Sequence, residues 1–352
     1  MYEQYNTAPF CRSPSLIEHT LGRLAAGEDL SLEEMSAAVD GIMRGEWSEN
    51  QVALFLTSLR AKGETVDEVA GAAAAMRRHM TPIRTRRVDL IDTCGTGGNS
   101  SSTFNISTTA ALVTAAAGVP VAKHGNRRVT SRSGSADVLA ELGVNIAAEP
   151  HRVTACLDEL GICFCFAPLC HAAMLHVAPV RRKLGVPTVF NLLGPLTNPA
   201  GASYQLLGVG RPELRPLLAA ALARLGVRRA LVVHGEDGLG EITLTGPTRV
   251  TEVHGDSLRD FVWTPGDFGL EPSPLDAIRV DGPERSAAMI RAVLEGQRGP
   301  ARDIVLLNAA AALWIAGRAE RPAAAADLAA QAIDSGAARD LLARLVERSN
   351  AA

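Results

Sequence analysis

From residue 88 onward, short apolar segments alternate with helical segments, and this alternation limits the fold more than any other feature of the sequence. Strands that alternate with helices are typical of a mostly parallel sheet covered by helices. With 352 residues, the chain is long enough for a large core and for more than one domain. The expected elements are strand 88–91, helix 105–117, strand 119–122, helix 135–142, strand 162–166, helix 214–225, strand 230–233 and helix 302–315.

The first eighty residues carry a different pattern, in which Ser or Thr is followed three residues later by Glu or Gln and then by an apolar stripe. Such a capping box marks a helix start, because its two side chains satisfy each other's backbone N–H groups. Gly63 is expected to end one of these helices. The four boxes are Ser15–Glu18, Ser31–Glu34, Ser48–Gln51 and Thr65–Glu68.

These patterns predict an α/β protein with two domains. A small, all-helical N-terminal domain over residues 1–84 is expected beside a larger α/β domain over 85–352 with a central, mostly parallel sheet. The segment of about 171–195 is rich in Gly and Pro, which mark a crossing between domains, so we expect it to return to the helical domain. The alanine-rich, weakly charged helices favour a homodimer formed through the helical domain.

Composition and charge exclude several classes of protein. The chain is 47% hydrophobic but only 4% aromatic, which suits helices and strands built from Ala, Leu and Val. A net charge of −3 gives no bulk attraction to nucleic acid. The sequence contains no apolar run of membrane-spanning length and no basic-then-apolar signal pattern at its start. We therefore expect a cytoplasmic protein that binds neither nucleic acid nor membrane.

The cysteines raise the question of a zinc site. Cys163, Cys165 and Cys170 lie close to His171 in the sequence, but their spacing matches no tetrahedral zinc motif. The stretch "ICFCF" is instead typical of a buried strand in which cysteine packs as a small hydrophobe. No structural zinc is expected.

Residues 92–108, "DTCGTGGNSSSTFNIST", form a glycine loop that leads into a helix. It lacks the lysine that ends a P-loop, and Ser100 stands where a dinucleotide-binding fingerprint needs its third glycine. Gly95, Gly97 and Gly98 leave backbone N–H groups bare beside a helix N-terminus, which together can bind an anion. Taken alone, the loop is explained equally well by a tight turn with a helix cap.

A second loop of similar character, "KHGNRRVTSRSGS", spans residues 123–135 and follows the next expected strand. Lys123, Arg127, Arg128 and Arg132 concentrate positive charge there. The ends of consecutive parallel strands lie at the same edge of a sheet, where ligands bind. The two loops then suit a ligand with two separated phosphate groups, whereas the alternative for the second loop is a solvated basic turn.

Together these motifs resemble the anthranilate phosphoribosyltransferase family over nearly the whole chain. The resemblance rests on "CGTGG", "TFNIST", "KHGNR", "SGSAD", "HVAPVR", "FNLLGPLTNPA" and "VVHGEDGL". It implies a fold of the nucleoside phosphorylase and phosphoribosyltransferase type. It also implies transfer of phosphoribosyl from phosphoribosyl pyrophosphate (PRPP) to anthranilate, with release of pyrophosphate, in tryptophan biosynthesis. Mg²⁺ is the implied cofactor, and no covalent nucleophile is expected because the amine of anthranilate is already a neutral nucleophile.

The resemblance also assigns site residues. Gly95, Asn126 and Arg181 match anthranilate contacts, and His124 and His176 lie near them. Ser107 and Glu241 match magnesium ligands. The positions that match PRPP contacts are Gly95, Gly98, Asn99, Thr103, Asn105, Ile106, Ser107, Thr108, Lys123, His124, Gly125, Asn126, Arg127, Arg128, Val129, Thr130, Ser131 and Ser135.

Two departures from the family pattern concern the metal. Asn99 and Gly240 stand where the family usually has aspartate, and each change removes a carboxylate, the ligand type that Mg²⁺ prefers. We therefore expect one magnesium ion held by the protein rather than two. Whether Glu236 or Asp237 supplies a substitute carboxylate stays open.

Two other functions remain as alternatives. A pyrimidine nucleoside phosphorylase would share the fold, although that group lacks the "FNLLGPLTNP" stretch. A non-catalytic relative that binds nucleic acid would also share it, but "KHGNR" and the net charge argue against this reading.

Overall fold

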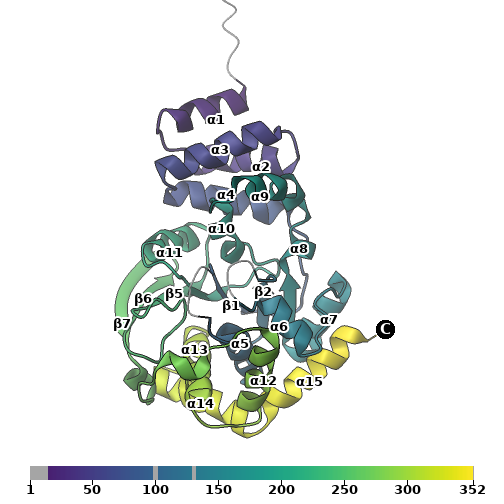
Figure 1. Cartoon of the computed structure of the whole chain (residues 1–352), viewed down its shortest axis with the longest axis vertical. Coiled ribbons are helices and arrows are strands. Elements are labelled where there is room, and N and C mark those ends of the chain that lie inside the picture. Colours follow the sequence, from purple (N-terminus) through teal and green to yellow (C-terminus); the bar gives the residue numbers. More distant parts are fainter. Residues whose placement is uncertain (1–14, 98–101, 129–131, 352) are drawn as a thin grey trace, which may run out of the picture.

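The computed structural model describes residues 15–97, 102–128 and 132–351, and a bundle of helices stands above an α/β unit (Figure 1). The expected ligand contacts at Gly98, Asn99, Val129, Thr130 and Ser131 lie outside the described residues. No described helix has the length and apolar character needed to cross a membrane.

The helical bundle forms as its capping boxes predict. In all four boxes the Ser or Thr side chain accepts the third backbone N–H, and the Glu or Gln accepts the N–H of the capping residue. Gly63 ends the third helix with φ = 89°, as expected. The helices are α1 (Leu16–Ala25), α2 (Leu32–Met43), α3 (Glu49–Lys62) and α4 (Val66–His79).

Short helices from the middle of the chain pack against this bundle. Val180 and Phe190 share a buried core with Phe55 and Leu56 of α3, and α9 packs against α3 (Figure 1). The division of the chain into domains at residues 84 and 85 stays a prediction. The short elements are α8 (Ala167–Cys170), η1 (Ala172–His176), α9 (Ala178–Leu184), α10 (Phe190–Leu193) and η2 (Gly194–Leu196).

A seven-stranded sheet in the order β3-β2-β1-β4-β5-β6-β7 forms the centre of the α/β unit. The first five strands in this order are parallel and the last two are antiparallel, which confirms the prediction of a mostly parallel sheet. The strands are β1 (Ile91–Gly95), β2 (Val121–Gly125), β3 (Ile162–Phe166), β4 (Tyr204–Gly208), β5 (Arg229–Gly235), β6 (Thr248–His254) and β7 (Ser257–Trp263).

The expected strand 88–91 is wrong in position. Val88 is 74% exposed, and Asp89 has φ = 56°, so the chain turns there before it enters the sheet at Ile91. The first part of the glycine loop, through Gly95, is therefore strand rather than loop. The expected strand 119–122 likewise lies later, at β2, whereas strand 162–166 is confirmed with Cys163 and Cys165 buried on it.

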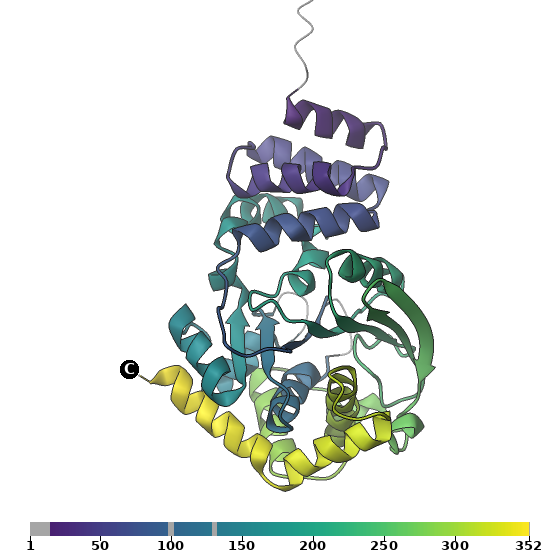
Figure 2. The same ribbon diagram turned by 180° about the vertical axis from the view of Figure 1, so that it is seen from behind.

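Helices cover both faces of the sheet, as Figure 2 shows from behind. Successive strand residues point to opposite faces. Leu206 accordingly joins the core formed with α5 and α13, whereas Leu207 joins the core of α11 and the helical bundle. The covering elements are α5 (Ile106–Ala116), α6 (Ser135–Glu141), α7 (Pro150–Leu160), α11 (Leu214–Arg224), η3 (Pro265–Phe268), η4 (Leu275–Ile278), α12 (Pro283–Leu294), α13 (Pro300–Ile315), α14 (Pro322–Asp334) and α15 (Ala337–Asn350).

Candidate active site

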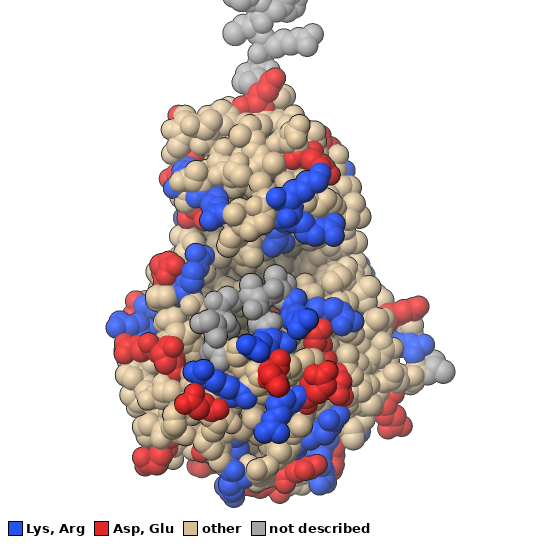
Figure 3. All heavy atoms as spheres, in the orientation of Figure 1, with Lys and Arg blue, Asp and Glu red and all other residues tan. Residues whose placement is uncertain are grey.

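The candidate site lies at the carboxyl edge of the sheet, where β1 and β2 both end in glycine. The chain runs from β1 through β2 to β3 on one side and then returns to place β4 on the other side of β1. Such a reversal of strand order is where open α/β sheets bind ligands. Figure 3 shows that the surface is hollowed between the helical bundle and the α/β unit, with Lys and Arg side chains on both sides.

Lys123 is buried at this edge, with only 4% of its surface exposed. Its Nζ donates to the Thr93 carbonyl oxygen at 2.6 Å and to Ser107 Oγ at 3.4 Å. Burial lowers the pKa of Lys123, and the charges of Asp92 and Glu241 oppose this effect. A buried ammonium is therefore directed toward the start of α5.

The two expected metal ligands lie together. The Glu241 carboxylate lies beside Ser107, whose hydroxyl and backbone N–H both act to lower the pKa of Glu241. Burial raises the pKa of Glu241 to about 7, although the charge of nearby Lys123 acts in the opposite direction, as Ser107 does. Asn105 makes no side-chain cap on α5, and Glu241 lies near Ser107 in the first turn of this helix, where the helix dipole favours an anion.

Rather than capping α5, the side chain of Asn105 connects the glycine loop of residues 92–108 to the second loop of residues 123–135. Its Oδ1 accepts the hydroxyls of Ser133 at 2.7 Å and Ser286 at 2.8 Å, and its Nδ2 donates to the Ser133 carbonyl at 3.3 Å. Ile106 is buried, and its N–H bonds to the Phe104 carbonyl. Within the described part of the chain, the buried hydroxyl of Thr108 has no hydrogen-bond partner.

The second loop is shaped by Asp137, which the sequence did not single out. Its Oδ2 accepts the backbone N–H groups of Arg128 at 2.8 Å and Gly134 at 3.2 Å, and its Oδ1 pairs with the Arg127 guanidinium at 3.1 Å. A Cβ on Gly134 would collide with the backbone of Arg127 and Arg128. The close return of the chain at this loop therefore requires glycine.

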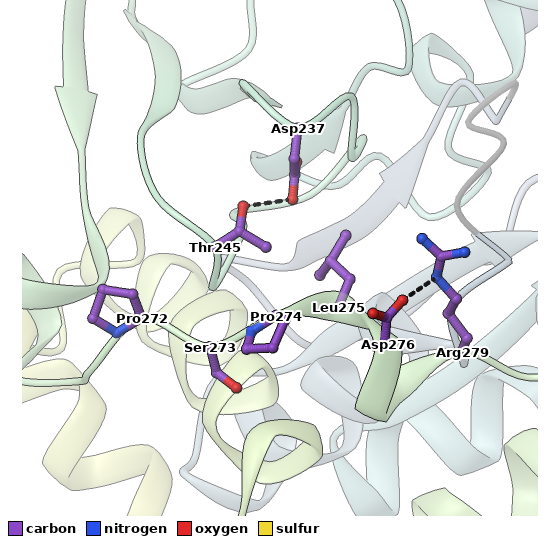
Figure 4. Close-up of a pocket in the computed structure, with 8 residues that line it drawn as sticks. All are labelled: Asp237, Thr245, Pro272, Ser273, Pro274, Leu275, Asp276 and Arg279. Carbon is purple, nitrogen blue, oxygen red and sulfur yellow. Dashed lines mark hydrogen bonds and ion pairs between the residues drawn. The ribbon is translucent and has the colours of Figure 1, made fainter.

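Thr103 forms an isolated β-bridge with Arg279, which connects the glycine loop to a neighbouring hollow. This cavity of about 500 Å³ is lined by the carboxylates of Asp237 and Asp276, and Figure 4 shows Asp276 paired with Arg279. Its lining residues are Asp237, Thr245, Pro272, Ser273, Pro274, Leu275, Asp276 and Arg279.

His124 points toward the middle segment of the chain. Its Nδ1 lies 3.1 Å from the Gly194 carbonyl oxygen, and its Nε2 lies 3.2 Å from His171 Nε2. Burial lowers the pKa of His124 to about 3 and that of His171 to about 4, so both rings are neutral at physiological pH. The side chain of His124 thus joins β2 to the segment that leads into the helical bundle.

Arg181 is half-buried on α9. Its Nη2 donates to Asn191 Oδ1 at 3.2 Å, and its guanidinium carbon lies 5.9 Å from the centre of the Phe190 ring. Burial lowers the pKa of Arg181, and no Asp or Glu in the described part of the chain pairs with it. Its guanidinium is thus available for an external carboxylate. Its expected position opposite Gly95 stays a prediction.

Neither of the two candidate substitute carboxylates joins Ser107 and Glu241. Glu236 pairs with Arg249 at 2.9 Å. Asp237 accepts the Leu239 N–H at 3.0 Å and the hydroxyls of Thr243 and Thr245. Residues 15–97, 102–128 and 132–351 contain no cluster of three His, Cys, Asp or Glu side chains able to hold a metal ion.

The fold and the site define a class of glycosyl transferases with two domains. The glycosyl transferase family's helical bundle domain matches residues 18–80, and its a/b domain matches residues 87–339. Within this class, the chain belongs to the anthranilate phosphoribosyltransferase family.

Individual relatives support this assignment over nearly the whole chain. The anthranilate phosphoribosyltransferase of Moorella thermoacetica is 51% identical over 331 residues, which cover 94% of this chain and 98% of that protein. The crystal structure of the Thermus thermophilus enzyme matches with a TM-score of 0.89 at 46% identity, over 94% of this chain and 99% of that one. The Saccharomyces cerevisiae enzyme in complex with PRPP and Mg matches with a TM-score of 0.88 at 29% identity, over 97% and 99%.

Proposed function

We propose that this chain transfers phosphoribosyl from PRPP to anthranilate and releases pyrophosphate, as a step of tryptophan biosynthesis. The observation that carries this proposal is the convergence of Lys123, Ser107 and Glu241 at one edge of the sheet, between two glycine loops. A fall in anthranilate fluorescence on addition of PRPP and enzyme tests it directly. Phosphate-dependent cleavage of thymidine or uridine, without that fall, would favour the nucleoside phosphorylase alternative.

The proposed reaction needs charge stabilisation more than proton transfer. As the bond from ribose C1 to pyrophosphate breaks, the anthranilate nitrogen forms its bond to C1 and loses a proton to water. The leaving pyrophosphate gains negative charge, which the Lys123 ammonium and the backbone N–H groups of the loops stabilise. Arg181 is the proposed contact for the anthranilate carboxylate, as a bidentate clamp. The other positions that match PRPP contacts of the family are proposed to bind PRPP. They include five residues outside the described part of the chain: Gly98, Asn99, Val129, Thr130 and Ser131.

The residues at the site fit one magnesium ion. Ser107 and Glu241 offer a hydroxyl and a carboxylate, which are the hard oxygen donors that Mg²⁺ prefers. When bound, Mg²⁺ would neutralise charge on pyrophosphate. Because Asn99 and Gly240 lack carboxylates and both Glu236 and Asp237 are engaged elsewhere, we propose one protein-held ion.

Replacing Gly240 with aspartate should create a second magnesium step, at a cost in stability. A Cβ at Gly240 would lie 3.2 Å from both the Gly210 nitrogen and the Val209 carbonyl carbon, so the end of β4 must shift by a few tenths of an ångström. Gly240→Ala is the matched control, since it adds the Cβ without the carboxylate. A magnesium titration of the rate and thermal unfolding measure the two effects. Two coupled steps in the wild type, unchanged in Gly240→Asp, would contradict the single-ion proposal.

Replacing Arg181 with methionine should raise the apparent KM for anthranilate about tenfold or more, because a charged hydrogen bond contributes about 1.5–3 kcal/mol. The KM for PRPP should change little. Arg182→Met is the control, because Arg182 is the exposed neighbour on the same helix. Steady-state kinetics with each substrate varied separates the two constants, and equal increases in both would rule against the carboxylate role.

We also propose that two chains associate through the helical bundle. Leu16 on α1 is 44% exposed and Leu54 on α3 is 50% exposed, and these two helices pack against each other, so both leucines add apolar surface that a second bundle could cover. Sedimentation velocity should then give the mass of a dimer, and Leu54→Arg should shift it toward the monomer. A wild-type monomer at micromolar concentration would refute this proposal.

A further inference from the structure

The residue pairing between strands β1 and β2 ends before the edge of the sheet that carries the site. They pair only at Ile91 and Val121, whereas β1 pairs with β4 through all of its five residues and β2 pairs with β3 through all of its five. The backbone ladder between β1 and β2 therefore stops after its first residue pair. The polar backbone groups beyond that point need other partners, because they are buried.

Two charged side chains supply those partners reciprocally across the gap. Asp92 of β1 accepts the backbone N–H of His124 on Oδ1 at 3.1 Å. Lys123 of β2 donates from Nζ to the carbonyl oxygen of Thr93 in β1 at 2.6 Å. A carboxylate from one strand and an ammonium from the other thus connect β1 and β2 beyond the point where their residue pairing ends.

Asp92 also connects this gap to the middle segment of the chain. Its Oδ2 accepts a hydrogen bond from Asn198 Nδ2 at 2.8 Å, and the same amide group donates to the Ala122 carbonyl at 2.8 Å. Asn198 lies two residues after the end of η2, whose first residue, Gly194, accepts a contact from His124. One carboxylate therefore contacts β2 and the segment that leads to the helical bundle.

The side chain of Asp92 is fully buried, with 0% of the residue exposed. A buried carboxylate is costly unless an opposite charge and hydrogen bonds compensate it. Asp92 receives two hydrogen bonds and lies near the charge of Lys123. Packing alone does not explain this residue, because an apolar side chain would avoid the cost of burial.

We infer that Asp92 is a positioning residue, which fixes the Lys123 ammonium and the end of β2 for binding of the substrate's pyrophosphate group. This inference rests on the proposed function for the identity of the phosphate-bearing substrate. It adds a residue that makes no proposed contact with either substrate and acts through Lys123.

Asp92→Asn tests the inference, with Glu68→Gln as a matched control. Glu68 is also a fully buried carboxylate that accepts a backbone N–H, from Leu30 at 2.9 Å, and pairs with a lysine, Lys62, at 2.9 Å, but it lies in the helical bundle. Both variants should unfold at lower temperature than the wild type. Only Asp92→Asn should weaken the binding of inorganic pyrophosphate, measured by calorimetry, by about tenfold or more.

A double-mutant cycle shows whether Asp92 acts through Lys123. In a Lys123→Met background, adding Asp92→Asn should change pyrophosphate affinity by less than about twofold, since the ammonium to be positioned is absent. It should also raise the unfolding temperature above that of Lys123→Met alone, because the second change removes a buried carboxylate that has lost its counter-charge. The rise in unfolding temperature remains measurable if Asp92→Asn alone does not fold.

Wild-type pyrophosphate affinity in folded Asp92→Asn would overturn the inference. Additive effects of Asp92→Asn and Lys123→Met on pyrophosphate affinity would also overturn it. These outcomes are distinct from a failure of the proposed function. In that case the wild type would bind pyrophosphate but leave anthranilate and PRPP unchanged. If the wild type is active, steady-state kinetics of Asp92→Asn should show a raised KM for PRPP, whereas the KM for anthranilate should change by less than about threefold.

Discussion

Lys123→Ala is expected to raise the apparent KM for PRPP about a hundredfold or more, with a much smaller change in the KM for anthranilate. The ammonium is buried at the sheet edge and directed at Ser107, so no other described lysine can replace it there. Each charged hydrogen bond to a bound phosphate contributes about 1.5–3 kcal/mol, or about 10- to 10²-fold in affinity, and an ammonium can donate to more than one phosphate oxygen. The loss also leaves Asp92 and Glu241 without their shared positive neighbour.

Initial rates with each substrate varied in turn measure this change. Lys62→Ala is a useful control, because Lys62 is also largely buried and paired with carboxylates, but in the helical bundle. Lys62→Ala should lower stability without changing either KM appreciably. If Lys123→Ala raised both KM values equally, the role of Lys123 would be structural, and the proposed pyrophosphate site would be wrong.

Glu241→Gln is expected to have the second large effect, on the magnesium dependence of the rate. Glutamine keeps the shape of the side chain beside Ser107, but it removes the negative charge that attracts a hard cation. The rate at low magnesium should fall by about 10²-fold, and high magnesium should restore part of it. A partial recovery is expected because pyrophosphate itself brings several negative charges to the metal.

Glu236→Gln is the matched control for this experiment. Glu236 lies five residues earlier, but it pairs with Arg249 on the surface, so its replacement should leave the magnesium titration unchanged. An unaltered titration in Glu241→Gln would show that this part of the chain does not hold the metal. A changed titration in Glu236→Gln would show instead that Glu236 takes part in the substrate complex.

The sequence predicts the helical bundle better than the strands, for a physical reason. A capping box is local, so Ser48 and Gln51 find each other wherever the helix lies. A strand boundary depends on the neighbouring strands, and apolar character alone misplaced the start of β1 at Val88. Strand β4 was missed, because its position depends on pairing with both β1 and β5.

In the candidate site, too, residues within local motifs were predicted, whereas residues that depend on distant contacts were not. Lys123, Ser107 and Glu241 were identified by motif, and the structure brings them together. Asn198 was missed because its contact with Asp92 spans 106 positions in sequence, and Ser286 because its contact with Asn105 spans 181. A signal for Asp92 was present, since an aspartate within an apolar strand must find partners when it is buried.

A fluorescence assay of anthranilate with PRPP across a magnesium titration distinguishes the proposed transferase from a nucleoside phosphorylase. We expect that fluorescence falls only when enzyme, PRPP and Mg²⁺ are all present, that pyrophosphate appears in an amount equal to the anthranilate consumed, and that a single magnesium step describes the rate. Unchanged fluorescence at every magnesium concentration, in a preparation that cleaves thymidine or uridine with phosphate, would contradict it.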